Sequence, residues 1–143
     1  MILGIGLDLC PIARMARALL RARFAERVFT PAERAYCRQR GEPAQHFAAR
    51  FAAKEATLKA LGVPRGLSWH ELEVVSENSG APRLVLRGVA ASAAAALGVH
   101  KLHLSLTHTT DAAAAVVVAE GSSRDLTPAP PSAAVRTDLP AGG

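Results

Sequence analysis

The pattern of hydrophobic and polar residues predicts short strands and helices along most of the chain. Apolar or alternating runs indicate strands, and apolar residues that recur every three or four positions indicate helices. The predicted strands are residues 2–9, 72–75, 83–86, 100–107 and 112–119. The predicted helices are residues 11–21, 31–40, 44–61 and 88–97. Both kinds of element are therefore expected in one domain.

Turn signals and glycines predict how some of the strands pair and pack. Glycines alternate with apolar residues in the strand 2–9, which predicts a buried strand that another group approaches closely. Polar turn residues at 78–82 and 108–111 each separate two predicted strands. Each turn is therefore expected to join its neighbouring strands into a pair.

Capping residues mark the ends of two helices. Thr30, Pro31 and Glu33 form the pattern of an N-cap, a proline in the first turn and a capping-box glutamate. Gly62 is placed to end the helix 44–61.

The composition changes abruptly at Ser122. The last 22 residues contain four of the nine prolines, no aromatic residue and no hydrophobic periodicity. Such a segment does not contain enough apolar surface to form a core. The predicted organisation is one folded domain at residues 1–121 and a disordered tail at 122–143.

Charge is concentrated in one part of the chain. Half of the 143 residues are hydrophobic and the net charge is +5, which fits a globular protein. Residues 14–40 contain eight arginines against two glutamates, so this segment alone carries a charge of +6. It would attract nucleic acid, an anionic membrane or an acidic protein, and charge alone does not choose among them. One face of the predicted helix 11–21 carries three of these arginines: Arg14, Arg17 and Arg21.

The cysteines and the length of the apolar segments indicate in which cellular compartment the protein is expected. Cys10 and Cys37 are the only cysteines, they lack metal-ligand spacing, and no signal-type segment is recognised. The longest alanine-rich run, residues 89–97, is far shorter than the roughly 20 residues that cross a bilayer. A cytoplasmic, reduced protein without a membrane-spanning segment is expected.

The helix 44–61 carries residues of chemical interest. Glu55 and Lys59 are one turn apart, and the simplest interpretation is an ion pair on a solvated face. Alanines around Glu55 would leave space for something to lie against this face, and Lys54 lies in the apolar stripe, where a charge needs a partner. In this arrangement the carboxylate could bind a hard cation or take a proton, and the ammonium could neutralise a phosphate oxygen.

Two further sites carry polar groups next to predicted strands. Asp8 lies at the end of the strand 2–9, where an acidic residue is more often a helix cap than a ligand. Together with Glu55, however, it would give Mg²⁺ the one or two carboxylates that this ion usually takes. His108 lies among serine and threonine hydroxyls that could hold phosphate oxygens.

Three segments resemble, in order and spacing, those of the holo-[acyl-carrier-protein] synthases, the small 4′-phosphopantetheinyl transferases of bacterial fatty acid synthesis. They are GIGLDLCPIARM at 4–15, RFAAKEATLKALG at 50–62 and HLSLTHTTDAAAAVVVAE at 103–120. The resemblance implies an α+β fold, with an antiparallel sheet and helices packed in a single compact domain. It implies a homotrimer whose sites are shared between neighbouring subunits.

The implied reaction transfers 4′-phosphopantetheine from coenzyme A to a serine of an apo acyl carrier protein, giving the holo carrier protein and adenosine 3′,5′-bisphosphate. The implied pathway is fatty acid biosynthesis, and a polyketide carrier protein stays open as an alternative. Asp8 and Glu55 would hold Mg²⁺, and Lys59 would contact the attacked phosphate. Glu55, directly or through a water on the metal, would take the serine proton.

The resemblance also implies contacts to the two substrates. His108 would lie near the 3′-phosphate of coenzyme A. Further coenzyme A contacts are implied for Arg50, Gly62, Ser105, Thr107 and Thr109. Arg14, on the arginine face with Arg17 and Arg21, would meet the acidic recognition helix of the carrier protein.

Two other interpretations stay open. The arginine-rich segment could bind nucleic acid, although aromatic residues make up only 4% of the chain and no helix-turn-helix pattern is present. The protein could also be a structural trimer without activity. In that case, the arrangement of Asp8, Glu55, Lys59 and His108 would be a coincidence. We expect neither nucleic acid nor a membrane as the partner.

Overall fold

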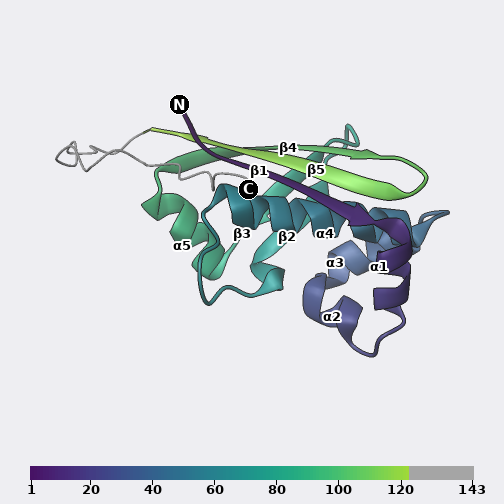
Figure 1. Cartoon of the computed structure of the whole chain (residues 1–143). Helices are drawn as coiled ribbons and strands as arrows, with labels where there is room; N and C mark the ends of the chain where they lie inside the picture. Colours follow the sequence, from purple (N-terminus) through teal and green to yellow (C-terminus); the bar gives the residue numbers. More distant parts are fainter. Residues whose placement is uncertain (123–143) are drawn as a thin grey trace, which may run out of the picture.

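The computed structural model describes residues 1–122, an α+β arrangement of antiparallel strands and helices (Figure 1). The main sheet has the order β1 (Ile2–Pro11), β5 (Ala112–Gly121), β4 (Val99–His108), and a second sheet pairs β2 (Leu72–Ser76) with β3 (Pro82–Leu86). The helices are α1 (Ile12–Leu19), α2 (Phe24–Val28), α3 (Pro31–Arg38), α4 (Pro43–Ala60) and α5 (Gly88–Ala96), with a short 3-10 helix, η1 (Trp69–Glu71). The predicted disordered tail lies outside the described residues, Ser122 excepted.

Helix α4 is the element around which the others are arranged. It packs against β1 and β5 on one face of the main sheet. Figure 1 shows α1, α2 and α3 gathered at one end of α4 and α5 near the other end. All five predicted strands and four predicted helices are confirmed, and both predicted turns join antiparallel pairs. The five-residue helix α2 was not predicted, because it is too short to show a helical period.

The backbone of β1 approaches the backbone of α4 closely at two glycines. A β-carbon on Gly4 would overlap the carbonyl oxygen of Ala60, and one on Gly6 would overlap the carbonyl oxygen of Ala56. The close approach predicted from the alternating glycines is therefore confirmed, and α4 is the group that makes it. Only residues without a side chain allow this contact.

The prediction that β1 is a buried strand is wrong for one of its two faces. Ile5, Leu7 and Leu9 are each more than 60% exposed, whereas Gly6 and Cys10 are buried. Strand β1 lies at the edge of the main sheet with only one face covered by α4. The strand alternates in burial, and its outer face is an unpaired apolar surface.

The alanines of α4 leave space for a neighbour, as expected, and that neighbour is the main sheet of the protein itself. Ala48, Ala52 and Ala56 are fully buried. Their small side chains let the helix lie close to the sheet, where Ala115 and Val117 of β5 are also buried. The space beside Glu55 is thus filled by the protein itself on this side of the helix.

The buried charge of Lys54 has the partner that its position requires. Lys54 Nζ lies 2.6 Å from Glu33 Oε1, and both side chains are fully buried. Lys54 also donates hydrogen bonds to the carbonyl oxygens of Val28 and Trp69. Glu33 accepts from the backbone N–H of Val74 at 3.0 Å. This pair ties α4 to α3, to the end of α2 and to β2.

The predicted helix ends are confirmed in detail. Thr30 and Glu33 form a complete capping box at the start of α3. At the end of α4, Gly62 has φ +74° and donates to the carbonyl of Lys59, while Val63 donates to that of Leu58. This pair of hydrogen bonds is a Schellman motif.

Two further expectations concern membranes and cysteines. Within residues 1–122, no helix combines the length and apolar character that crossing a bilayer requires. Cys10 and Cys37 are both buried free thiols.

We predict that Gly6→Ala destabilises the fold, because the added methyl group has to displace the backbone of α4. The free energy of unfolding should fall by about 3 kcal/mol, the upper part of the range for overpacking. Gly41→Ala is the matched control, since a β-carbon there meets nothing within 4 Å. Denaturant titration of both variants at one protein concentration measures the difference, and equal stabilities would contradict the close approach.

Candidate active site

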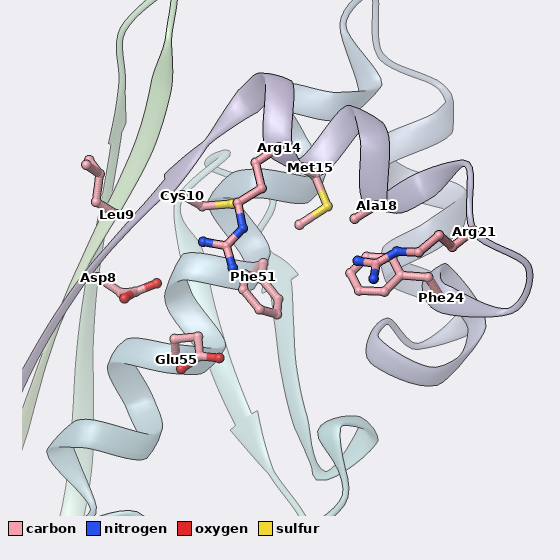
Figure 2. A pocket seen from close by; sticks show the side chains of 10 residues that line it. All are labelled: Asp8, Leu9, Cys10, Arg14, Met15, Ala18, Arg21, Phe24, Phe51 and Glu55. Carbon is pink, nitrogen blue, oxygen red and sulfur yellow. The ribbon is translucent and has the colours of Figure 1, made fainter.

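A cavity of about 310 Å³ opens where β1, α1 and α4 meet. We call it the carboxylate pocket, because Asp8 of β1 and Glu55 of α4 both line it (Figure 2). Its other lining residues are Leu9, Cys10, Arg14, Met15, Ala18, Arg21, Phe24 and Phe51. The two carboxylates come from elements that the glycine contact holds together.

Asp8 and Lys59 form an ion pair across the β1–α4 contact. Lys59 Nζ lies 3.1 Å from Asp8 Oδ1 and donates to the Leu7 carbonyl oxygen at 2.9 Å. The expected pair between Glu55 and Lys59 is therefore not formed, because the strand offers Lys59 a closer partner. Asp8 is not a helix cap either, since it lies within β1 and α1 starts without a side-chain cap.

The pKa of the Glu55 carboxyl group is shifted by burial and by neighbouring charges. Burial raises the pKa of Glu55, and the nearby charge of Asp8 raises it further. Lys59 and Arg14 act in the opposite direction. A carboxyl group that is partly desolvated beside a second carboxylate is poised to gain a proton or a cation.

The carboxylate pocket offers the donor atoms that suit a hard divalent cation. Mg²⁺ prefers oxygen ligands and commonly takes one or two carboxylates, with water and substrate phosphates as the others. Within residues 1–122, no group of three or more His, Cys, Asp or Glu side chains is clustered for a metal. Asp8 and Glu55 thus fit a shared metal site that substrate completes, and do not fit a closed protein cage.

The predicted arginine face borders this pocket. Arg14 and Arg21 line it, and Figure 2 shows Arg14 extended from α1 toward the space between β1 and α4. The Arg21 guanidinium lies 5.3 Å from the ring centroid of Phe24. Arg17 is exposed on α1 and does not line the pocket.

A second cavity, also of about 310 Å³, lies between α3, α4, the β2–β3 pair and β4. We call it the anion pocket, because its lining includes Arg50 and two histidines but no Asp or Glu. The lining residues are Tyr36, Gln45, His46, Ala49, Arg50, Ser76, Gly80, Pro82, Leu104, Ser105, Leu106, Thr107 and His108.

Arg50 is the unusual residue of the anion pocket. It is only 4% exposed, and no ion pair within residues 1–122 includes it. Its Nη2 donates to Ser76 Oγ at 3.4 Å, and its buried Nε has no hydrogen-bond partner in this part of the chain. A buried cation without a carboxylate is costly unless an anion binds it.

The remaining predicted substrate contacts are distributed around the anion pocket. Ser105, Thr107 and His108 line it, and Thr109 lies beyond the end of β4, where its hydroxyl accepts from the backbone N–H of Ala112. Gly62 lies after α4 and lines neither pocket.

Sequence reasoning missed four polar side chains of the anion pocket: Tyr36, Gln45, His46 and Ser76. His46 precedes Arg50 by one helical turn, and this spacing was an available signal. Tyr36 reaches the pocket from α3, and no local pattern indicates that.

The two pockets share no lining residue, so one chain does not bring all predicted site residues together. Asp8, Glu55 and Arg14 belong to the first pocket, and Arg50 and His108 belong to the second. Asp8 also lines an open hollow of about 600 Å³ with Leu7, Leu9, Lys59 and Ala114. The ion pair of Asp8 and Lys59 therefore borders the exposed outer face of β1.

Comparison with known proteins identifies the family. A family model described as the 4′-phosphopantetheinyl transferase superfamily matches residues 4–117. The holo-[acyl-carrier-protein] synthase of Anaeromyxobacter dehalogenans is 55% identical over 127 residues, covering 85% of this chain and 98% of that protein. The chain belongs to the holo-[acyl-carrier-protein] synthase family. The resemblance noted in the sequence is thereby confirmed.

Solved structures of holo-[acyl-carrier-protein] synthases have the same fold. The enzyme from Neisseria meningitidis superposes with a TM-score of 0.73 at 32% identity, covering 84% of this chain and 99% of that one. The enzyme from Bacillus anthracis, solved in complex with CoA (3′,5′-ADP), gives a TM-score of 0.70 at 34% identity, with 85% and 99% covered. The predicted α+β fold class is confirmed, and family membership makes the chain a phosphopantetheinyl transferase and thus an enzyme.

We predict that Asp8→Asn lowers the pKa of Glu55 and that Arg14→Ala raises it. The first change removes a like charge and frees Lys59, and the second removes an opposite charge, so the shifts have opposite signs. A pH titration of the Glu55 carboxyl ¹³C signal in the metal-free protein measures both. Shifts of the same sign would contradict the placement of these groups around Glu55.

Proposed function

We propose that this enzyme transfers the 4′-phosphopantetheine group from coenzyme A to a serine of an apo acyl carrier protein. The products would be the holo carrier protein and adenosine 3′,5′-bisphosphate, and the pathway would be fatty acid biosynthesis. One observation carries the proposal: two carboxylates line one pocket with an ion-paired lysine beside them, while a buried arginine without a carboxylate lines another. The first arrangement suits phosphoryl transfer, and the second suits a phosphate ligand.

The carboxylate pocket would be the reaction centre. Asp8 and Glu55 would hold Mg²⁺, which supplies charge neutralisation at the pyrophosphate of coenzyme A. Lys59 would exchange its contact with Asp8 for the phosphate oxygen on which charge develops. Its side chain is half exposed, so this movement requires no rearrangement of the core.

Glu55 is the proposed proton acceptor. The serine hydroxyl of the carrier protein attacks the β-phosphate, which carries pantetheine, and adenosine 3′,5′-bisphosphate leaves. The hydroxyl proton goes to Glu55, directly or through a water. Burial raises the pKa of Glu55 in the metal-free protein, and a bound Mg²⁺ would lower it, which would keep the carboxylate ionised and able to accept the proton.

The anion pocket would bind other phosphates of coenzyme A. Arg50 offers a buried guanidinium, His108 would lie near the 3′-phosphate, and Ser105 and Thr107 add hydroxyl donors. Thr109 and Gly62 belong to the proposed contact set through the family resemblance alone.

The arginine face, made of Arg14 and Arg17 of α1 and of Arg21 just beyond its end, is the proposed docking surface for the carrier protein. Arg14 and Arg21 line the carboxylate pocket, so an acidic helix bound to them would lie beside the reaction centre. Arg17 would add charge at the rim. Such charges mainly accelerate association, and salt weakens their effect.

The complete site would form between subunits of a homotrimer. Each pocket holds only part of the predicted residues, and the Asp8–Lys59 pair borders the exposed apolar face of β1 at Leu7 and Leu9. A neighbouring subunit that covers this face would remove the apolar surface from water. It would also bring its own anion pocket toward the carboxylates of the first subunit.

We predict that Asp8→Asn and Glu55→Gln each reduce transfer at least about a hundredfold, the effect of losing a metal ligand or general base. The assay incubates the full chain with coenzyme A, Mg²⁺ and an apo carrier protein, and intact mass spectrometry follows the gain of one phosphopantetheine group. Asp111→Asn and Glu77→Gln are matched controls, because both residues are exposed and outside both pockets. Near-normal transfer by either pocket variant would refute the assigned roles.

Mixing two inactive variants tests the shared site. Glu55→Gln disables the carboxylate pocket, and Arg50→Met disables the anion pocket while filling a similar volume. If each site combines one pocket from each of two neighbours, random reassembly of equal amounts should restore about a quarter of the wild-type sites. Activity no higher than the sum of the separate variants would place a complete site within one chain.

A further inference from the structure

Two guanidinium groups lie over the ring of Tyr36 at the wall of the anion pocket. The central carbon of Arg50 lies 3.8 Å from the ring centroid, and that of Arg40 lies 4.2 Å from it. The His46 ring meets Tyr36 edge-on, with 6.0 Å between the centroids. Tyr36, His46 and Arg50 all line the pocket, so this cluster forms part of its surface.

The Arg50 guanidinium lies on the ring of Tyr36 and has few other partners within residues 1–122. Arg50 makes one side-chain hydrogen bond in this part of the chain, the long contact to Ser76, and its Nε is buried without a partner. The negative face of an aromatic ring attracts a cation, and the attraction strengthens when water is excluded. Arg50 is 4% exposed, so the ring acts on a largely desolvated group.

A ring orients a cation without neutralising it. A carboxylate in place of the ring would form a salt bridge with Arg50 and compete with any phosphate for the guanidinium. Tyr36 leaves the charge available, and within residues 1–122 the Arg50 Nε has no hydrogen-bond partner. The neighbouring His46 and His108 add donors that suit a doubly charged phosphate monoester.

We infer that Tyr36 is a positioning residue that holds Arg50 in place to bind a phosphate monoester in the anion pocket. The inference rests on the proposed function, in which that group is the 3′-phosphate of coenzyme A. This phosphate is the only monoester of that molecule, and His108 of the same pocket is the residue proposed to meet it.

The test measures equilibrium binding of coenzyme A and of 3′-dephospho-coenzyme A to the full chain by titration calorimetry. We expect Tyr36→Leu to weaken binding of coenzyme A about five- to thirtyfold, the loss of one desolvated cation–π contact. Binding of 3′-dephospho-coenzyme A should stay within about twofold, because it has no phosphate monoester. Tyr36→Phe, which keeps the ring, should bind both compounds like the wild type.

The possible outcomes distinguish a failure of the positioning role of Tyr36 from a failure of the proposed function. Unchanged coenzyme A binding by Tyr36→Leu would overturn the inference, and so would equal weakening of both compounds or equal losses in the Leu and Phe variants. A wild-type protein that binds neither compound would instead refute the proposed function. Sedimentation and thermal unfolding of the two variants confirm that assembly and fold are intact before binding is compared.

Discussion

The contact between the backbones of β1 and α4 determines how the charged side chains of the two elements are placed relative to one another. At Gly4 and Gly6 the strand meets the carbonyl oxygens of Ala60 and Ala56, a distance that excludes any side chain. This close approach places Asp8 beside Lys59, and it brings Asp8 and Glu55 into the same carboxylate pocket. A wider spacing between strand and helix would separate these groups and disrupt the proposed reaction centre without removing any of its residues.

The opposite side of α4 is held by a buried ion pair. Lys54 and Glu33 are both fully buried, and together they contact α2, α3, β2 and η1. A buried pair of this kind adds little net stability, but removal of one partner is costly because the other charge is left alone. The pair therefore restricts the position of α4, which lies between the sheet on one side and this anchor on the other.

Sequence patterns predicted the elements well because their signals are local. The capping box of Thr30 and Glu33, the glycine after α4 and the alternation in β4 each involve residues a few positions apart. Partners across the fold could not be predicted in this way. Lys59 is one turn from Glu55, yet it pairs with Asp8 of another element, and Tyr36 reaches the anion pocket from α3. Whether one chain holds the complete site is likewise a property of packing.

Helix α4 also explains how a single segment serves two pockets. Arg50 lines the anion pocket, and its neighbour Phe51 lines the carboxylate pocket with Glu55 one turn later. Consecutive residues on a helix point about 100° apart, so the two pockets lie on adjacent faces of the same rigid rod. Ala52 and Ala56 lie on the opposite side of the helix, toward the sheet, and Lys54 faces the buried Glu33. Because residues 50–55 contribute to both pockets, a shift of this helix would disturb both pockets at once.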